Sequence, residues 1–538
     1  MNPKSIATAF LLALSLAGCL PSSEKRGNAV IYCSEGSPNK LGPQVVSDGT
    51  SITASARAVF DRLVEFELGK TTIVPGLAER WEISPNGLEY TFYLRKNVPF
   101  HSNDLFTPTR PFNADDVVYS IGRMADPKHP LHQVGGGIYE FYQALGMDKN
   151  IKEVQKVGDH KVKIVLKGPH AAFLSQMATH HMSITSKEYG EKLIALGKAD
   201  LFDMKPVGTG PFVFQKYVKD TLIRYKSFKK HFSKAPAFDE LIFSITPDPN
   251  VRFQKIKTGE CHIVAEPSPA DLAAMETHKE IEVIRKSGLN VGYLAMNTGK
   301  TPFQDKRIRK AVNMALNKKS YIKAIYFDRA TVAKNPIPPT LWSYHEGIKD
   351  YAYDPERAKK LLKEAGYPNG FDTDIWVLPV SRPYNPDGKK MGEMMQADLK
   401  KVGIRAEIVS YDWGTYLDKS RKDEHSMLQL GWSADYADPE NFLSVLLSCA
   451  SVKSGTNTAK WCHGPFDEAV QKAKVLNSQK EREALYKKAQ EIFKEEAPWV
   501  TLANATIYRA VRKNIGGYVI DPLGGDHFYS VVIKGKTP

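Results

Sequence analysis

Along the chain, short stretches in which every second residue is hydrophobic alternate with longer stretches in which hydrophobic residues recur at the spacing of a helix. Residues 88–95 alternate apolar and polar side chains, which is typical of a half-buried strand. In the second half, Ile308, Val312 and Leu316 fall on one face of a helix predicted over residues 305–316. The mixture of the two periods predicts an α/β protein with helices packed on mixed sheets.

One β-α-β unit is visible in this pattern. Strands are predicted at residues 374–378 and 405–409, with a helix at 390–402 between them. Asn113 is followed by two acidic residues, so we expect it to cap the start of another helix. The same criteria predict further strands and helices at 161–166, 241–245, 291–296, 355–365 and 479–495.

Composition narrows the class of protein. The 538 residues are 42% hydrophobic, 10% aromatic and 25% charged, a globular balance with material for about three to four domain-sized units. This aromatic content excludes a disordered chain, and the charge with a mean hydropathy of -0.36 excludes a multi-span membrane protein.

The net charge of +14 is spread along the chain without a long Lys/Arg tract, so we interpret it as a solvated basic surface and predict no nucleic-acid partner. Residues 226–234 interleave bases with aromatics, as single-strand binders do, but an exposed charged hairpin is the better interpretation.

The first residues predict export. Residues 1–18 have a short polar start and an apolar run at 6–17, which is shorter than the roughly 20 residues that span a bilayer and fits a signal peptide. Residues 16–19 (LAGC) look like a lipobox, in which Cys19 is lipidated and becomes the mature N-terminus, and residues 19–28 form a tether. The alternative is an ordinary cleaved signal followed by a chance cysteine.

Four cysteines remain after Cys19, and an oxidising compartment favours two disulfides among them, with three possible pairings. Cys449 and Cys462 are close enough in sequence to close a short loop, which leaves Cys33 with Cys261. No Cys-x-x-Cys or paired Cys/His spacing is present, so no zinc site is predicted.

Motifs of catalysis are missing from the sequence. Gly69-Lys70-Thr71 resembles the end of a phosphate-binding loop, but Val64 stands where that motif needs glycine. There is no G-x-S-x-G and no H-E-x-x-H. His180 and His181 are adjacent and so point in different directions, which argues against joint metal ligation. The sequence therefore predicts a binding protein without metal or cofactor; a secreted hydrolase would need a nucleophile–base pair that we do not find.

Specific segments resemble a known family. The chain is similar to the large periplasmic solute-binding proteins of ABC importers, peptide/nickel class (family 5), and within it to the dipeptide-binding branch and its haem- and glutathione-binding lipoprotein relatives. The resemblance covers essentially the whole mature chain. It is carried by residues 32–37 (YCSEGS), 62–66 (RLVEF), 75–79 (PGLAE), 112–118 (FNADDVV), 206–212 (PVGTGPF), 288–293 (GLNVGY), 382–386 (RPYNP), 411–413 (YDW) and 431–442.

The resemblance implies a two-lobed periplasmic-binding-protein (Venus flytrap) fold whose lobes are joined by two crossover strands. Lobe I would cover residues 28–286, with an insert subdomain at about 60–210. Lobe II would cover 287–504, and residues 505–538 would return to complete lobe I. The dipeptide-binding pattern also implies the same two cysteine pairs.

The resemblance also implies a ligand site between the lobes. Asp435 would bind the α-ammonium of a dipeptide, and Arg382 would bind its carboxylate through a planar fork of donors. Side-chain walls and backbone partners would come from Tyr384, Trp413, Gly49, Thr50, Trp432, Ser433 and Ala434, with Gly49-Thr50 and Ser433 pairing with the peptide as an added strand would.

Each assignment has a structural alternative. Asp435 would otherwise form a turn before Asp438, an arginine before proline is usually exposed, and a tryptophan such as Trp413 usually packs in a core.

The expected function is a monomeric lipoprotein that captures dipeptides or short peptides in the periplasm of a Gram-negative bacterium and delivers them to an inner-membrane permease. A glutathione or haem receptor of the same family is the alternative. A further alternative is an antimicrobial-peptide-resistance relative, against which the protein's own positive charge argues.

Overall fold

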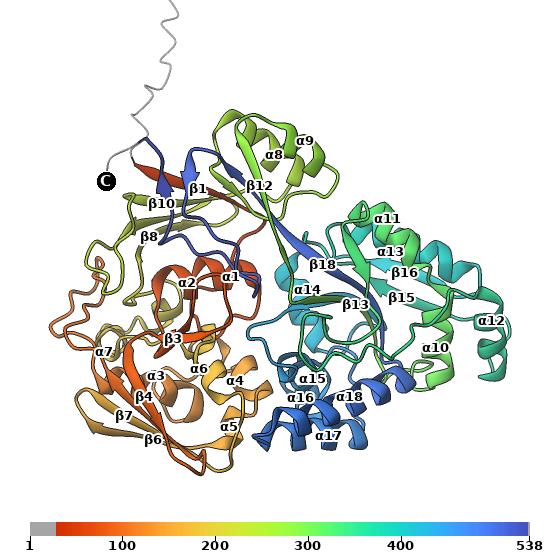
Figure 1. Ribbon diagram of the computed structural model, residues 1–538, viewed down its shortest axis with the longest axis horizontal. Helices are drawn as coiled ribbons and strands as arrows, with labels where there is room; N and C mark the ends of the chain where they lie inside the picture. The colour runs from red at the N-terminus through yellow and green to blue at the C-terminus, as the bar shows by residue number, and fades with distance from the viewer. Residues whose placement is uncertain (1–27, 536–538) are drawn as a thin grey trace, which may run out of the picture.

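The computed structural model describes residues 28–535, which form two halves side by side (Figure 1). The predicted signal peptide, Cys19 and the tether up to residue 27 lie outside the described residues. No helix within residues 28–535 combines the length and the apolar character needed to cross a membrane.

A mixed twelve-stranded sheet runs through both halves. Its strands are β1 (Ala29–Ser34), β8 (Phe212–Val218), β9 (Leu222–Ser227), β10 (Glu240–Ile245), β11 (Ile263–Val264), β12 (Ile281–Ser287), β13 (Asn290–Met296), β14 (Ala330–Val332), β15 (Asp372–Trp376), β16 (Arg405–Val409), β17 (Met427–Ser433) and β18 (Trp499–Arg512). The order is β16-β15-β17-β13-β18-β11-β1-β10-β9-β8, and β12 and β14 also pair with β18.

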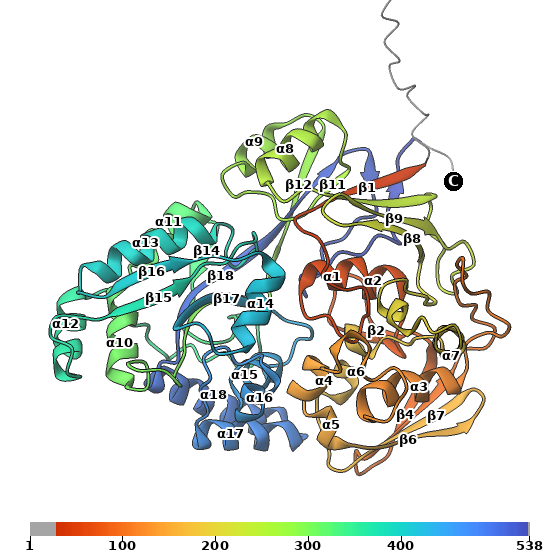
Figure 2. The same cartoon turned by 180° about the vertical axis from the view of Figure 1, so that it is seen from behind.

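The long strand β18 connects the halves. Its first part pairs with β13 and β14, up to Ala505, and its second part, from Thr506, pairs with β12 and β11. Only Gly288 and Leu289 separate β12 from β13. The chain therefore passes between the halves at two adjacent places, as the crossing strands in Figures 1 and 2 show.

A second sheet forms its own layer in the half that contains the N-terminal strand. It has the order β4-β5-β7-β6, and β2 pairs with β3 nearby. Their bounds are β2 (Val64–Phe66), β3 (Ile73–Pro75), β4 (Ala78–Ile83), β5 (Glu89–Leu94), β6 (Ile151–Gly158) and β7 (Lys161–Leu166). Two short strands near the C-terminus, β19 (Ile515–Gly516) and β20 (Val532–Ile533), pair with each other.

Helices pack against these sheets, and in the four-stranded sheet α3 lies on one side of β6 and β7 (Figure 2). Their bounds are α1 (Gly49–Ala54), α2 (Ala56–Val59), α3 (Ala114–Ala125), α4 (Glu140–Ala144), α5 (Met147–Asn150), α6 (Phe173–Met177), α7 (Lys187–Ala195), α8 (Pro249–Thr258), α9 (Leu272–Thr277), α10 (Lys306–Ala315), α11 (Lys318–Tyr326), α12 (Pro355–Glu364), α13 (Gly388–Lys400), α14 (Trp413–Arg421), α15 (Glu440–Leu447), α16 (Cys449–Ser454), α17 (Gly464–Val475) and α18 (Gln479–Glu496), with 3-10 turns η1 (Val134–Gly136), η2 (His180–Met182) and η3 (Ala199–Asp203).

Local capping chemistry explains where several helices begin. Asn113 caps α3 as predicted: its side chain accepts from the Asp115 N–H at 2.9 Å, and Asp116 accepts from the Asn113 N–H at 3.0 Å. Asp387 caps α13 by accepting from the Lys390 N–H at 3.0 Å, so that helix begins at Gly388, two residues before the prediction.

The predicted β-α-β unit is present, since β15 and β16 pair in parallel with α13 between them. The first strand was predicted two residues too late. It covers Asp372–Trp376 because Leu378 leaves the ladder and donates its N–H to the Gln429 side chain at 3.2 Å.

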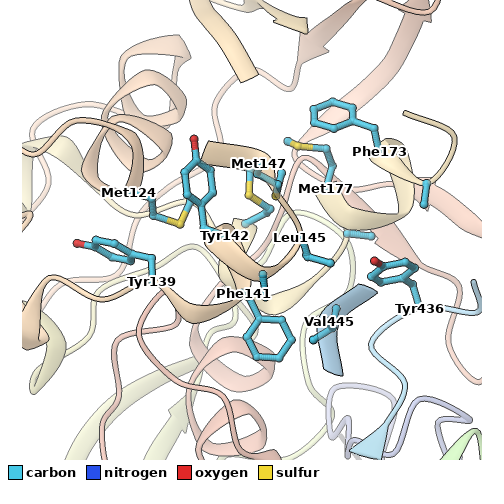
Figure 3. Packing of buried hydrophobic residues seen from close by; sticks show 14 of the residues in the cluster. Met124, Tyr139, Phe141, Tyr142, Leu145, Met147, Phe173, Met177, Tyr436 and Val445 are labelled. Carbon is cyan, nitrogen blue, oxygen red and sulfur yellow. The ribbon is translucent and has the colours of Figure 1, made fainter. Parts of the chain in front are cut away.

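One apolar core reaches across the two halves. Figure 3 shows Phe141 and Leu145, from the α4 side, close to Tyr436 and Val445 from the other half. All four side chains are at most 3% exposed. The halves are therefore packed against each other along part of their facing surfaces.

Two disulfides are present among residues 28–535, in the pairs named from the sequence. Cys33–Cys261 joins β1 to the segment before β11, with Cα atoms 5.8 Å apart. Cys449–Cys462 closes a short loop at the start of α16, with Cα atoms 4.5 Å apart.

Candidate ligand-binding cleft

A cleft of about 1200 Å³, including its open mouth, lies between the halves. Both halves line it, through the segments that contain α1, α2 and α4 on one side and α14, β17 and the loop after β15 on the other. The C-terminal loop 523–526 also lines it. Its described lining combines aromatic and aliphatic side chains with six carboxylates and four arginines. A concave site between two parts of a protein is a usual place for a small molecule to bind.

Arg382 lies in this cleft and is held by a tight turn. Its backbone N–H donates to the Asn385 carbonyl at 3.0 Å, and the reciprocal bond is also 3.0 Å. The guanidinium donates to Glu35 at 2.8 Å and to Thr50 Oγ1 at 3.2 Å. Because a guanidinium has five N–H donors, Arg382 keeps capacity for a ligand carboxylate after these bonds.

Glu35 and Arg382 perturb each other electrostatically. Burial alone would lower the pKa of Arg382, but Glu35, acting together with Tyr384, Asp48 and Glu266, outweighs burial and raises that pKa. Burial alone would raise the pKa of Glu35, yet Arg382 and the Thr50 hydroxyl hold it below its usual range. Both groups are therefore charged at neutral pH.

Asp435 lies just beyond the end of β17 and, among residues 28–535, forms no ion pair with an arginine or lysine. One carboxylate oxygen, Oδ2, accepts from Asn441 Nδ2 at 3.2 Å, and the Asp435 N–H donates to Asn441 Oδ1 at 2.9 Å. Burial raises the pKa of Asp435 to about 7, although Asn441 and the more distant Arg57 oppose the shift. Only 14% of its side chain is exposed. A buried carboxylate without a cation is costly when ionised, so this position favours a positively charged ligand group.

The other carboxylates that line the cleft are satisfied within the described chain. Asp48 caps α1. The remaining four form ion pairs with arginines: Glu35 with Arg382, Glu140 with Arg421, and Glu266 and Asp526 with Arg509. Asp435 differs from these five carboxylates because, among residues 28–535, it neither caps a helix nor forms an ion pair with an arginine.

Aromatic rings form the walls. Trp413 is the first residue of α14, and the Arg382 guanidinium lies 5.2 Å from the centroid of the Trp413 ring. Tyr384 is 7% exposed and packs on Gly431, where an added Cβ would lie 2.2 Å from the Tyr384 ring. Trp432 packs against Phe141 of the opposite half, with ring centroids 5.5 Å apart.

Seven of the nine residues predicted to bind ligand line this cleft: Asp435, Arg382, Tyr384, Trp413, Gly49, Trp432 and Ser433. Thr50 and Ala434 do not. The Thr50 side chain is bound to Glu35 and Arg382, and Ala434 is fully buried with its N–H donated to the Leu289 carbonyl at 2.7 Å.

The added-strand role predicted for Gly49-Thr50 does not fit the structure. These residues begin α1, because Asp48 accepts from the Ser51 N–H at 3.1 Å and caps a helix there. A helical backbone cannot extend a β-ladder. Ser433 does end a strand, β17, and pairs with Asn290 of β13.

Several cleft residues were missed from the sequence. Glu35 lies within the quoted segment 32–37, so its position was visible although its ion pair with Arg382 was not. The loop 523–526 contains adjacent glycines, and an added Cβ on Gly525 would lie 1.5 Å from an Arg57 nitrogen. That glycine pair was the available signal for a close approach of backbone to the site.

The described chain holds no group of three or more His, Cys, Asp or Glu side chains arranged to bind a metal ion. His180 and His181 are both buried and point to different partners: His180 Nε2 lies 3.0 Å from the Val46 carbonyl, and His181 Nε2 lies 3.3 Å from the Met147 sulfur.

Known proteins are similar over almost the full chain. The dipeptide-binding protein of Escherichia coli is 46% identical over 97% of this chain and 98% of that protein. Heme-binding protein A of Haemophilus influenzae is 42% identical over 100% of both.

Two solved structures are similar to this chain over almost the same length. A dipeptide binding protein from Pseudoalteromonas in complex with Met-Leu matches with a TM-score of 0.92 at 38% identity, over 94% of this chain and 100% of that one. The ABC transporter-associated periplasmic binding protein DppA from Helicobacter pylori, in complex with peptide STSA, matches with a TM-score of 0.90 at 36% identity, over 94% and 98%. The family model for bacterial extracellular solute-binding proteins, family 5 (middle), matches residues 72–454. The chain therefore belongs to the family 5 bacterial extracellular solute-binding proteins.

Proposed function

We propose that this protein captures dipeptides or short peptides between its two halves and delivers them to an ABC permease of the inner membrane. The observation that carries the proposal is the pair of groups in one cleft: a buried carboxylate at Asp435 that has no cationic partner among residues 28–535, and a guanidinium with spare donors at Arg382. A zwitterionic peptide has the complementary ammonium and carboxylate. The proposed role involves binding and release, with no chemical step.

The relatives support this choice of ligand. Two similar proteins are named dipeptide-binding or are solved with Met-Leu, and the Helicobacter structure contains a four-residue peptide. A di/tripeptide-binding protein of Pseudomonas aeruginosa is 43% identical to this chain. Main-chain groups and the two charged anchors would bind any sequence, so we expect broad tolerance of side chains.

A haem or glutathione receptor is the second candidate, favoured by the similarity to Heme-binding protein A. Among residues 28–535, those that line the cleft include no histidine, cysteine or methionine, the usual axial ligands besides tyrosine, and His180 lines only the small neighbouring cavity. Of the two tyrosines there, Tyr32 donates its hydroxyl to Asp526 at 2.8 Å. Glutathione, which also carries an ammonium and carboxylates, fits the same anchors.

We place the protein in the periplasm as a monomer, anchored through lipid on Cys19 after removal of residues 1–18. For the lobes we propose residues 28–286 with an insert at about 60–210, then 287–504, and 505–538 returning to the first lobe. The change of partners of β18 between Ala505 and Thr506 supports these boundaries.

The test is isothermal titration of the mature, lipid-free protein with Ala-Phe after unfolding and refolding to remove carried-over ligand. We expect micromolar or tighter binding in the parent protein and a loss of about 2–5 kcal/mol in Asp435→Ala, because the ligand ammonium is left buried without a partner. Asp372→Asn is the matched control, since that exposed carboxylate pairs with Arg405 away from the cleft. No heat from sound refolded parent protein, with heat from glutathione or haem, would refute the peptide assignment.

A further inference from the structure

His180 is a buried histidine that directly faces Asp435. It lies in η2, is 6% exposed, and its ring packs edge-on against Phe141 with centroids 4.5 Å apart. Its Nε2 lies 3.0 Å from the Val46 carbonyl oxygen. Because a carbonyl oxygen only accepts, Nε2 must carry the proton, and a neutral ring then leaves Nδ1 as an acceptor.

The ring is neutral at physiological pH. Burial lowers the pKa of His180 to about 3; the Val46 carbonyl opposes this shift, and the positive charges of Arg57 and Arg62 add to it. His180 therefore does not act as a cationic partner of Asp435, although the two side chains are adjacent.

The side chains of His180 and Asp435 are adjacent but do not form a hydrogen bond with each other. Asp435 Oδ2 is bound to Asn441, and its other oxygen, Oδ1, lies 3.8 Å from His180 Nδ1. That distance is too long for a hydrogen bond. Both side chains also line a small cavity next to the main cleft, and Asp435 and Arg57 border both cavities. Within residues 28–535, Asp435 Oδ1 and His180 Nδ1 therefore face each other beside this cavity, and neither atom accepts a hydrogen bond from another side chain or from the backbone.

We propose that His180 Nδ1 is a second hydrogen-bond acceptor for the ligand's ammonium, acting together with Asp435 Oδ1. The proposal rests on the proposed function, in which Asp435 binds that ammonium. A nitrogen about 2.9 Å from each acceptor bridges two atoms that are 3.8 Å apart. Asp435 supplies the negative charge that pairs with the ammonium, and His180 Nδ1 accepts a second N–H from it. A ligand that lacks the amino group makes neither contact.

The purely structural alternative makes a different prediction. If His180 only fills space and binds Val46, its replacement weakens every ligand to the same degree, whether or not the ligand has an ammonium. If it accepts from the ammonium, its replacement weakens specifically those ligands that carry one. The ratio of the two affinities separates the two roles independently of protein stability.

The experiment measures the affinities of Ala-Phe and of N-propionyl-phenylalanine, which lacks only the amino group, by calorimetric titration and competition. The variants are His180→Leu, which removes the acceptor, and His180→Asn, which keeps a side-chain oxygen near the position of Nδ1. His181→Leu is the matched control, because this neighbouring buried histidine contacts Thr179 and Met147 rather than Asp435.

We expect the parent protein to prefer Ala-Phe by at least about 100-fold, and His180→Leu to reduce this preference by about tenfold, the scale of one hydrogen bond to a charged group. His180→Asn should restore most of the preference, and His181→Leu should leave it unchanged. An unchanged ratio in His180→Leu overturns the role of His180 but leaves the peptide function intact. No binding of Ala-Phe to the parent protein refutes the peptide function itself.

A measurement on the parent protein covers the case in which His180→Leu does not fold. The nitrogen-15 resonance of a bare imidazole nitrogen moves upfield when that nitrogen accepts a hydrogen bond. We expect the His180 Nδ1 resonance to move upfield on addition of Ala-Phe and to stay in place with N-propionyl-phenylalanine. Identical responses to both ligands overturn the proposal.

Discussion

Replacing Asp435 by asparagine should have two opposite effects, one on stability and one on binding. Asparagine has the same shape and keeps a hydrogen bond to Asn441 but carries no charge. The empty protein should become more stable at neutral and alkaline pH. At the same time it should lose its affinity for dipeptides.

The magnitude of the stability effect follows from the pKa of Asp435, which burial raises from 3.8 to about 7. At about 1.36 kcal/mol per unit, the cost of ionising the buried group is about 4 kcal/mol. Below about pH 4 the carboxyl is protonated in both folded and unfolded states and costs nothing. As the pH rises from about 4 to about 7 the unfolded state ionises first, so the stability of the parent protein falls, and the full cost is present above pH 7.

The assay is thermal unfolding of parent and Asp435→Asn at about pH 4, 6 and 8, each with and without Ala-Phe. Without ligand, the two melting temperatures should agree at about pH 4 and diverge by about pH 8, with the variant higher. With ligand at about 100 times Kd, the parent should gain about 2.7 kcal/mol and the variant almost nothing.

Asp521→Asn is the control of opposite sign. Despite its burial, Arg57 and His527 lower the pKa of Asp521 to about 2, so its ionised form stabilises the fold above about pH 4 and this contribution is lost as the pH falls through 2. Its asparagine variant should be less stable than the parent at about pH 8. A difference between Asp435→Asn and parent that does not change with pH would refute the reasoning about the buried carboxylate.

Two further substitutions test the ion pairs of the cleft. Arg382→Leu leaves Glu35 buried without its cation, so we expect the free energy of unfolding, measured with denaturant, to fall by about 3–5 kcal/mol and the pKa of Glu35 to rise. Adding Glu35→Gln to this variant should recover most of the stability, and no recovery would contradict the pairing. Arg421→Gln removes the ion pair with Glu140 that joins α14 to α4 across the cleft. Because the two side chains are 27% and 16% exposed, we expect ligand dissociation in stopped flow to accelerate only about two- to fivefold, and by less at high salt. An unchanged dissociation rate would show that this pair does not retain ligand.

Local signals predicted much of the fold. Asn113 was identified as a cap because asparagine with acids in the first turn satisfies the free N–H groups of a helix, an interaction within four residues. The strands at 161–166 and 405–409 have the predicted bounds because their alternation or apolar content is strong. The strand-like backbone predicted for Gly49-Thr50 differs from the helix that begins there, because Asp48 caps that helix and this local signal conflicts with the role implied by the resemblance.

Long-range relations in the cleft could not be predicted in the same way. Glu35 and Arg382 are 347 positions apart, and Asp435 and His180 come from different halves of the molecule. Sequence patterns record what lies along one element, whereas these contacts depend on how β18 pairs with strands of both halves. The resemblance supplied Asp435 and Arg382 as candidates, but only the structure shows that one is paired and the other is not.

We propose that the two halves open and close around the ligand, and the difference between the two anchors then indicates how ligand favours the closed arrangement. Away from the cleft, Glu440 is fully buried where the halves meet and already has partners from both: His170 Nε2 at 3.0 Å, Gln176 at 3.2 Å and Lys474 at 3.3 Å. That contact stabilises closure without ligand. Asp435 opposes it, since an ionised carboxylate enclosed without a cation is better hydrated in an open cleft.

An ammonium placed on Asp435 removes this opposition, so bound ligand needs to change the balance by only a few kcal/mol to populate the closed state. Closure and the choice of ligand would then depend on the same carboxylate. On this reasoning Asp435→Asn, although unable to bind dipeptides, should be more closed than the parent at about pH 8 when empty, with a smaller radius of gyration in X-ray scattering. An empty variant as open as the empty parent would show that the charge of Asp435 does not control closure.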